Sequence, residues 1–171
     1  EDACHAPGGY FVDSKGEVNF CGNGNYADIG VFSFHPVKHI ACGEGGMLTT
    51  NSKKIYEKLL LLRTHGITKQ HMEENHGKWY YEMHELGFNY RLTDFQSALG
   101  ITQLAKNDKG VARRNEISAT YKKAFEGKIK FQHLPSETYN AHHLFIIEVE
   151  NRKELYDYLH SKGILAQIHY V

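Results

Sequence analysis

Residues 32–46 read FSFHPVKHIACGEGG and place one lysine, Lys38, between an apolar run and a cluster of glycines. The run at residues 29–34 predicts a buried strand, and the glycines at positions 43, 45 and 46 predict a tight turn. A lysine in such a loop is usually solvated. A catalytic amine, however, must be deprotonated near neutral pH, and burial or a neighbouring cation favours that form. The setting of Lys38 therefore leaves two interpretations open, a solvated side chain and a reactive amine.

Composition limits the class of protein. The chain has 171 residues, of which 41% are apolar and 23% are charged, as in ordinary globular domains. Its 20 basic and 20 acidic residues balance, so electrostatics does not favour binding to nucleic acid or to an anionic membrane. No stretch approaches the roughly 20 apolar residues that span a bilayer. The three cysteines have no paired spacing and predict free thiols in a reducing cytoplasm.

The two ends of the sequence predict that the chain is a segment of a longer protein. It begins with EDACH, without an initiator methionine, and it stops within the apolar alternation AQIHYV. Domain boundaries usually fall in exposed, polar linkers, and neither end has that character.

Strand and helix signals alternate along residues 1–127. Residues 7–25 are rich in glycine and asparagine and predict a loop with one hairpin. The helix expected from residue 52 has Asn51 or Ser52 as its N-cap, and the next begins with Thr93 and Gln96 as a capping box. The ranges expected here are strands at 29–34 and 46–50, helices from 52, at 93–104 and at about 109–125, and a polar connection at 64–85.

The pattern changes after the helix that ends near Gly127. Strands are expected at residues 128–133 and 143–149, a helix at 153–162 ended by Gly163, and a further strand from 164 to 171. We therefore predict an α/β fold in two parts, residues 1–127 and 128–171.

The twelve histidines do not predict a metal site. His35 and His39 are four apart, but Pro36 between them argues against the helix that such a pair of ligands requires. The remaining candidate pairs, His71 with His76 and His142 with His143, lack a cysteine or carboxylate at ligand spacing. We interpret them as surface or packing residues. The glycines near Lys38 also do not match a P-loop, which needs a following Lys-Ser/Thr.

Four residues together favour the reactive amine. Asp2 and His5 are three apart at the end of an expected strand, and Ser33 precedes Lys38 by five positions. A carboxylate suits a pyridinium nitrogen, a hydroxyl suits a phosphate, and the glycines leave room for a planar group. In this order the residues describe a pocket for pyridoxal 5′-phosphate, PLP.

The segments EDACHA, ADIGVFSFHPVKHIACGEGGMLTTN and LGFNYRLTDFQSALGITQL resemble the sugar-nucleotide aminotransferases of the DegT type. The resemblance covers nearly the whole chain, because several motifs occur in family order. It implies a fold type I PLP-dependent transferase: residues 1–127 would be part of the large cofactor domain, and residues 128–171 the start of the small C-terminal domain. The family's aromatic residue that stacks on the cofactor and its Gly-Ser/Thr phosphate turn have no counterpart in this chain.

The resemblance also implies residue roles. Lys38 matches the lysine that binds PLP covalently and carries the proton, and Asp2 matches the carboxylate that pairs with the ring nitrogen. His5 matches a position near the ring's 3-oxygen, and Ser33 matches a phosphate-binding hydroxyl. Asn89 matches an asparagine that reaches the phosphate of the neighbouring subunit's cofactor, which implies a homodimer. Arg91 and His169 match positions that contact the substrate.

The implied reaction is the transfer of an amino group from glutamate to a keto sugar nucleotide. The wording of SFHPVKHI and RLTDFQSALGITQL is most similar to the branch that acts on a UDP-4-keto-6-deoxy-N-acetylhexosamine in pseudaminic acid biosynthesis. Two departures from the family are the long loop between His5 and Asp28 and the presence of Cys42 where threonine is frequent.

Three other functions are compatible with parts of the pattern. A related sugar dehydratase uses the same cofactor but has histidine at the lysine position, which Lys38 disfavours. A non-catalytic protein with this fold would have no reason to keep Asp2, His5, Ser33 and Lys38 together. A metal hydrolase would have to use the histidines, whose spacing is unsuitable.

Overall fold

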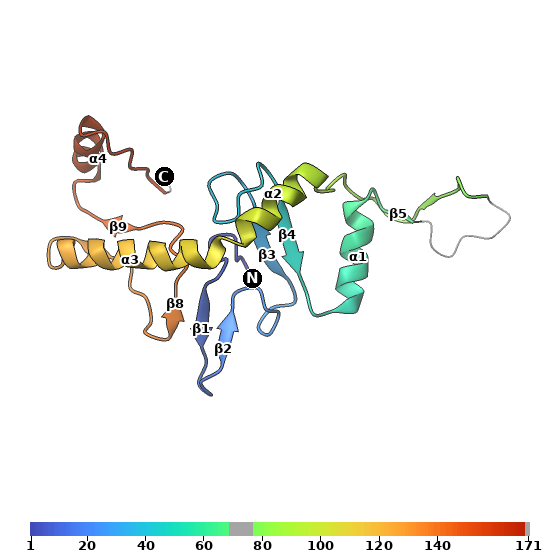
Figure 1. Cartoon of the computed structure of the whole chain (residues 1–171), viewed down its shortest axis with the longest axis horizontal. Coiled ribbons are helices and arrows are strands. Elements are labelled where there is room, and N and C mark those ends of the chain that lie inside the picture. Colours follow the sequence, from blue (N-terminus) through green and yellow to red (C-terminus); the bar gives the residue numbers. More distant parts are fainter. Residues whose placement is uncertain (69–76, 170–171) are drawn as a thin grey trace.

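The computed structural model describes residues 1–68 and 77–169, and it shows an elongated mixture of helices and short strands (Figure 1). The helices are α1 (Lys53–Arg63), α2 (Asp94–Leu104), α3 (Asn107–Phe125) and α4 (Arg152–Ser161). The strands are β1 (Tyr10–Val12), β2 (Val18–Phe20), β3 (Gly30–Ser33), β4 (Gly46–Thr49), β5 (Ile67–Thr68), β6 (Glu82–Met83), β7 (Lys130–Phe131), β8 (Thr138–Tyr139) and β9 (Ile147–Glu148).

The β3–β4 hairpin carries the segment that contains Lys38. The two strands pair antiparallel, from Gly30 opposite Thr49 to Ser33 opposite Gly46. Both strands agree with prediction to within one residue at each end. Residues 1–3 lie on the other side of β3 in parallel orientation, since the Ala3 amide donates to the Val31 carbonyl at 2.9 Å. The predicted strand before the Asp-x-x-His motif is thus a short parallel neighbour of β3.

The predicted hairpin within residues 7–25 is confirmed as β1 and β2. Asp13 organises its turn, because Oδ1 accepts the amides of Lys15 and Glu17, each at 2.9 Å. Strand β8 pairs with the other edge of β1 and gives a three-stranded sheet in the order β2-β1-β8. A strand beyond residue 127 therefore belongs to the same sheet as the first hairpin.

The predicted helix starts are confirmed at α1 and α2. Ser52 caps α1, and its side chain accepts the Ile55 amide. Thr93 and Gln96 form the full capping box of α2, in which the Thr93 side chain accepts the Gln96 amide and Gln96 accepts the Thr93 amide. Helix α3 begins at Asn107, two residues before the expected start, directly after the end of α2.

The core lies beneath the loop that carries Lys38. Phe34, Ile40 and Cys42 form a buried cluster, and Phe32 packs against it. The loop is closed at its base because the Phe34 amide donates to Gly45 and the Cys42 amide donates to Phe34. Helix α2 packs on this loop, where Gln96 Nε2 donates to the Glu44 carbonyl at 2.9 Å.

Residues 64–85 are more structured than the expected connection. Strands β5 and β6 pair antiparallel through Ile67 opposite Met83 and Thr68 opposite Glu82. The Gly66 amide donates to the carbonyl of Leu61 and so holds the start of this ribbon against the end of α1. The interpretation of His71 and His76 as surface residues falls on positions outside the described residues.

The C-terminal part contains the predicted strand–strand–helix order, but the last strand is absent from the described residues. Strands β7 and β9 pair antiparallel, and α4 ends before Gly163, whose φ is 76°. Residues 164–169 form no strand. Local bonds occupy this segment instead, since the Ala166 amide donates to Ile164 at 2.9 Å and His160 Nε2 lies 2.9 Å from the Ala166 carbonyl oxygen. The predicted strand is therefore wrong for these six positions, and residues 170–171 lie outside the described part.

None of the helices in the described part of the chain combines the length and apolarity needed to cross a membrane. The cysteines Cys4, Cys21 and Cys42 are all free thiols, as predicted.

Candidate active site

Two parallel segments deliver the candidate residues to one edge of the structure. Asp2 lies at the parallel bridge to Val31, and the chain reaches His5 just beyond it. Ser33 ends β3, and Lys38 follows in the turn after the strand, where its amide donates to the His35 carbonyl at 2.9 Å. Because the segments run parallel, their carboxyl ends lie on the same side, which is where α/β sheets place ligand sites.

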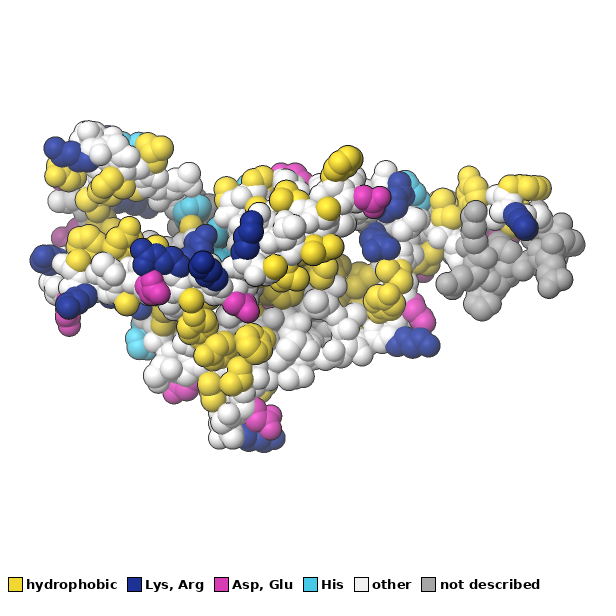
Figure 2. Space-filling model, in the orientation of Figure 1, with side chains coloured by type: hydrophobic (Ala, Val, Ile, Leu, Met, Phe, Trp, Pro, Cys, Tyr) yellow, Lys and Arg dark blue, Asp and Glu magenta, His cyan; other side chains and the backbone are white. Residues whose placement is uncertain are grey.

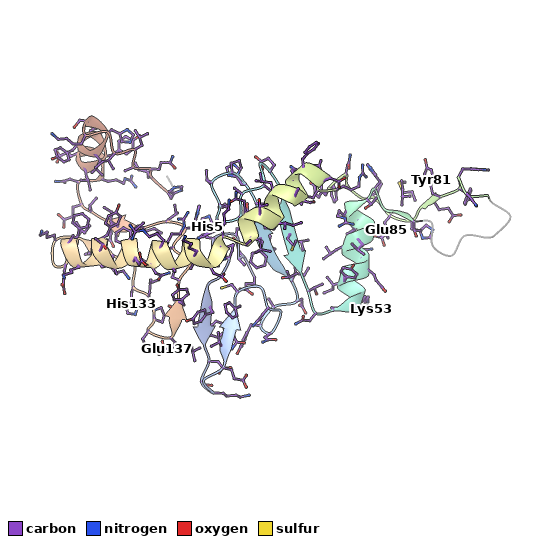
Figure 3. The ribbon with its side chains drawn as sticks, viewed as in Figure 1. His5, Lys53, Tyr81, Glu85, His133 and Glu137 are labelled. Carbon is purple, nitrogen blue, oxygen red and sulfur yellow. The ribbon has the colours of Figure 1, made fainter. Side chains whose placement is uncertain are left out.

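Lys38 and His5 are in direct contact. Nζ of Lys38 forms a hydrogen bond with Nε2 of His5. A protonated lysine has only donors, so Nε2 of His5 must then be the unprotonated acceptor of its ring. Lys38 is half-buried and His5 is partly exposed near the middle of the molecule (Figure 3). The amine therefore lies at an accessible edge and is oriented by an imidazole.

Asp2 is held in its ionised form. Hydrogen bonds from the Cys4 thiol and the Cys4 amide lower the pKa of Asp2, and the nearby His5 and Lys38 lower it further. The amide bond measures 3.0 Å from Cys4 N to Asp2 Oδ1. The same contact raises the pKa of the Cys4 thiol. A permanent negative charge thus lies beside the Lys38–His5 pair.

Ser33 lies at the end of β3 with its hydroxyl turned toward its own loop. Its Oγ accepts the His35 amide at 3.4 Å, a long hydrogen bond. The side chain is half-buried. Within residues 1–68 and 77–169, no hydrogen bond joins Ser33 to the Lys38–His5 pair, although β3 ends at the same edge.

The three remaining predicted residues lie in different places. Asn89 is exposed and forms a bridge with Thr64 at the end of α1, and Arg91 is exposed two positions further on. Within the described ranges, neither residue forms a hydrogen bond or ion pair with Lys38. His169 lies close enough to the site for its charge to contribute to lowering the pKa of His5. One chain therefore brings together Asp2, His5, Lys38 and His169.

Two histidines that the sequence analysis assigned to surface or packing roles lie at this site. The ring centroid of His143 is 4.2 Å from that of His5 and 5.5 Å from that of His39. Burial is the main cause that lowers the pKa of His143, to about 4, so this imidazole is neutral at neutral pH. Nε2 of His39 lies 2.9 Å from the carbonyl oxygen of Ala141, a residue 102 positions further along the chain. No local sequence signal predicts that His39 and His143 meet, because the contact joins segments so far apart.

Within the described residues, no group of three or more histidine, cysteine, aspartate or glutamate side chains has an arrangement that could hold a metal ion. His71 and His76 lie outside the described residues.

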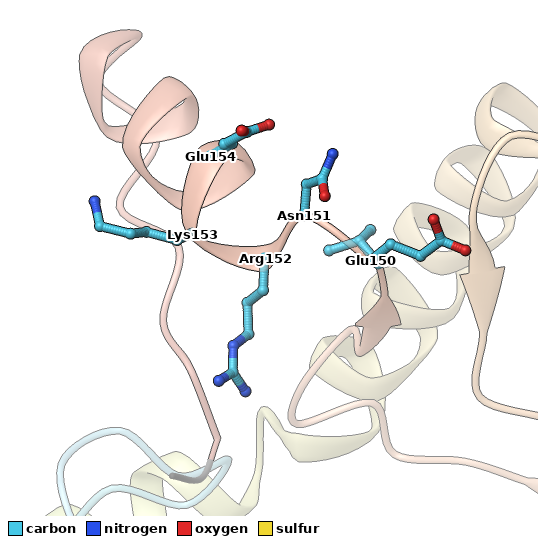
Figure 4. A pocket seen from close by; sticks show the side chains of 6 residues that line it. Glu150, Asn151, Arg152, Lys153 and Glu154 are labelled. Carbon is cyan, nitrogen blue, oxygen red and sulfur yellow. The ribbon is translucent and has the colours of Figure 1, made fainter.

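A surface cavity lies elsewhere. It has a volume of about 540 Å³ and is lined by residues 149–154, at the start of α4 (Figure 4). All of its lining residues come from one continuous segment, and none of them belongs to the group around Lys38. We therefore place the candidate site at Lys38 and not at this cavity.

Solved structures show that the fold is that of sugar aminotransferases. A putative sugar aminotransferase from Streptococcus pneumoniae, Spr1654, matches 99% of this chain with a TM-score of 0.83 and 27% identity. PseC of Helicobacter pylori, described as an aminotransferase involved in the biosynthesis of pseudoaminic acid, matches 99% of the chain with a TM-score of 0.83 and 32% identity. The predicted fold class, an α/β fold of the PLP-dependent transferase type, is confirmed.

The chain belongs to the DegT/DnrJ/EryC1/StrS aminotransferase family, whose model matches residues 1–171. Among curated relatives, a UDP-4-amino-4,6-dideoxy-N-acetyl-beta-L-altrosamine transaminase of Campylobacter jejuni is 38% identical over 99% of this chain. The transaminase of the same name from Helicobacter pylori is 34% identical over 99% of the chain. In both alignments the chain spans 44% of the relative, so it corresponds to less than half of those proteins.

Proposed function

We propose that the full-length protein is a PLP-dependent aminotransferase that moves an amino group from glutamate to a keto sugar nucleotide. The proposed acceptor is of the UDP-4-keto-6-deoxy-N-acetylhexosamine type, in the synthesis of an amino sugar similar to pseudaminic acid. The observation that carries this proposal is the Lys38 amine held against His5 beside the ionised Asp2, in a chain of this family. The names of two curated relatives support this acceptor, since each is a transaminase named for a UDP-linked 4-amino-4,6-dideoxy sugar.

The residues at the site fit PLP. A carboxylate that stays ionised suits a pyridinium nitrogen, because the resulting charge-assisted hydrogen bond keeps that nitrogen protonated. A primary amine at an accessible edge suits the aldehyde carbon of the cofactor. The Spr1654 structures were determined in a PLP form and a PMP form, which supports the same cofactor here.

Each residue then has a definite task. PLP, when bound, supplies an electron sink that stabilises negative charge at the carbon that loses its proton. Lys38 would hold the cofactor through Nζ and, when free, would take up and return that proton at the same atom. Asp2 would maintain the ring's positive charge, and His5 would orient the lysine. Ser33 would bind the phosphate through its hydroxyl, and His169 would contact the sugar nucleotide.

We also propose that the active enzyme is a homodimer in which Asn89 and Arg91 serve the partner's site. Two observations support this. Asn89 lies at the end of α1 and makes no bond to the Lys38 group within the described residues. Large apolar side chains beside it are strongly exposed, with Leu86 at 86% and Phe95 at 89%, and hydrophobic side chains gather over α2 (Figure 2). Exposed apolar surface of this kind marks interaction sites.

A mixing experiment tests the shared site. Lys38→Ala and Asn89→Ala proteins should each be inactive, while subunit exchange should restore about a quarter of the wild-type activity, because half of the dimers are mixed and each has one intact site. A mixture of Lys38→Ala with Asp2→Asn is the control and should stay inactive, since both changes fall in the same chain's half of the site. Equal recovery in both mixtures would contradict the proposal.

The direct test of the cofactor assignment is a covalent one. PLP added to the cofactor-free, full-length protein should give the absorbance band of a lysine-bound pyridoxal group. Borohydride reduction followed by peptide mass spectrometry should then locate the pyridoxyl group on Lys38. Reduction products distributed over surface lysines, with none on Lys38, would overturn the assignment.

The main competing function is sugar dehydration, which uses the same cofactor. The presence of Lys38 favours amino transfer, because dehydratases of this fold have histidine at that position. Consumption of the keto sugar without formation of an amine would support the dehydratase.

The free state of all three cysteines supports the cytoplasm as the location of the enzyme.

A further inference from the structure

His143 packs on the imidazole that contacts the proposed catalytic lysine. The His5 and His143 ring centroids are 4.2 Å apart with an angle of 47° between the ring planes. His5 also contacts Lys38, through its Nε2 and the lysine Nζ. His5 is thus held between an aromatic neighbour and the amine, and the conformation of its ring depends on both.

Helix α3 fixes the backbone on which His143 lies. Arg114 Nη1 donates to the carbonyls of His142 at 3.0 Å and His143 at 3.3 Å, and Asn115 Nδ2 donates to the carbonyl of Asn140 at 2.9 Å. The amide of His142, a residue with a positive φ of 49°, donates in turn to Asn140 Oδ1 at 2.7 Å. Residues 140–143 are therefore an anchored turn.

The same helix also anchors the segment that contains His5. Asn107, the first residue of α3, is buried, and its Nδ2 donates to the carbonyl of Pro7 at 3.3 Å. Gly8 makes this approach possible, because a β-carbon there would lie 2.7 Å from Asn107 Nδ2. One rigid helix thus determines the separation of His5 and His143.

His143 is not a cation at neutral pH. Its pKa of about 4 leaves the ring neutral, and its buried Nδ1 has no hydrogen-bond partner among residues 1–68 and 77–169. What the ring contributes at this position is its flat face against His5.

We propose that His143 is a positioning residue that packs on His5 and directs Nε2 of His5 toward the amine of Lys38. This inference deepens the proposed function and rests on it, because the pair that His143 orients is the one assigned to cofactor binding. By covering one face of His5, His143 also keeps that imidazole neutral and available as the acceptor for Lys38. A residue beyond position 127 thereby contributes to the site formed by residues 2–38.

The groups around His5 determine the pKa that a titration of this residue will measure. Loss of water around the ring is the main cause that lowers the pKa of His5, and the charge of Lys38 adds to it. Asp2 acts in the opposite direction, and His169 acts in the same direction as Lys38. His39 and Arg114 face His143 and contribute to its own lowered pKa. Removal of the His143 ring should restore water to His5 and raise its pKa toward the ordinary value of 6.5.

The test is an NMR titration of histidine-labelled, cofactor-free, full-length protein, with the His5 signal assigned by its loss in His5→Gln. In wild type, His5 should titrate below 6.5, and His143→Ala should raise that pKa. His143→Phe retains a flat ring and should titrate like wild type. His142→Asn, at the adjacent residue whose left-handed backbone suits asparagine, is the matched control and should also match wild type.

The second readout is the rate at which PLP becomes attached to Lys38. This rate should fall in His143→Ala by about tenfold and up to about 100-fold, the scale of loss for a misplaced reacting group, and His143→Phe should retain most of it. If His143→Ala does not fold, His143→Leu replaces it, because leucine fills the volume without a flat ring. An unchanged His5 pKa in the variant without a ring, or a His143→Phe protein as impaired as His143→Ala, would overturn the proposal. Failure of wild type to attach PLP would instead reject the proposed function, while the titration would still decide the role of His143.

Discussion

The backbone of Gly100 in α2 lies directly against Sγ of Cys42, so that a β-carbon at position 100 would come within 2.8 Å of the sulfur. Cys42 is 2% exposed and belongs to the buried cluster with Phe34 and Ile40 beneath the Lys38 loop. The contact therefore sets how closely α2 approaches that loop.

Gly100→Ala should destabilise the full-length protein. Alanine ordinarily stabilises a helix interior by about 0.5–1 kcal/mol relative to glycine, but overpacking of a filled core costs about 1–3 kcal/mol. The free energy of unfolding, measured by chemical denaturation, should therefore fall by roughly 1 kcal/mol. Gly110→Ala in α3 is the matched control and should stabilise the protein, because a β-carbon there meets no atom of the described residues within 4 Å.

The double variant Cys42→Ala/Gly100→Ala checks the cause. If the sulfur is the obstacle, the two changes together should cost less than the sum of the single changes, by at least about 0.5 kcal/mol. Strict additivity would mean that Gly100 is needed for some reason other than the approach of Cys42.

Position 38 requires a lysine, and a positive charge alone is not sufficient there. Lys38→Ala should abolish amino transfer and leave the fold intact, because the side chain is half-buried at an edge and not in the core. Lys38→Arg should be equally inactive, since a guanidinium stays protonated and cannot bond covalently to the cofactor's aldehyde. Product formation from glutamate and a keto sugar nucleotide, with circular dichroism as the check on folding, measures both. Turnover by either variant would refute the assignment of Lys38.

Asp2 should matter for its charge more than for its shape. Asp2→Asn retains the size of the side chain and removes the negative charge that the Cys4 hydrogen bonds stabilise. Activity should fall by about 100-fold or more, as expected when a group that stabilises charge in the reaction is lost. Asp13→Asn is a useful control, because Asp13 also accepts two backbone amides but lies in the β1–β2 turn. It should keep near-normal turnover.

The parts of the structure that local signals control could be predicted from the sequence. The capping residues Ser52 and Thr93 fixed two helix starts, because their side chains bond within the same turn. The grouping of Asp2 with Lys38 was also predicted, since a carboxylate for the ring nitrogen and an amine for the aldehyde belong to one PLP pocket. Pairing between distant segments had no such signal. The contact of His143 with His5 and the pairing of β8 with β1 both depend on how α3 returns the chain, which no local spacing encodes.

The strand expected at residues 164–171 failed for a related reason. An alternating apolar pattern predicts a strand only if a partner edge is available to it. In the described residues 164–169 the backbone finds local acceptors, and Ile164 itself donates to the Leu159 carbonyl at the end of α4. His169 still comes near His5, so the position of this residue did not require the predicted strand.

The cluster formed by His5, His39 and His143 makes the free energy of unfolding depend on pH in a definite direction. Burial lowers the pKa of His39 and His143 in the folded protein, with His143 at about 4, whereas an unfolded chain has histidines at 6.5. Between about pH 6.5 and pH 4 the unfolded state therefore binds more protons, so stability rises with pH across this window and is lost as the pH falls through it.

Denaturation midpoints of the full-length protein, measured at intervals from pH 7.5 to pH 4.5, should accordingly decrease toward acid. His143→Phe should have a smaller decrease than wild type, because one of the groups that gains a proton only on unfolding has been removed while the packed ring is retained. His133→Asn, at an exposed histidine outside the cluster (Figure 3), should reproduce the wild-type curve. Parallel curves for wild type and His143→Phe would show that His143 is protonated to the same extent in the folded and unfolded states, contrary to its position against His5 and His39.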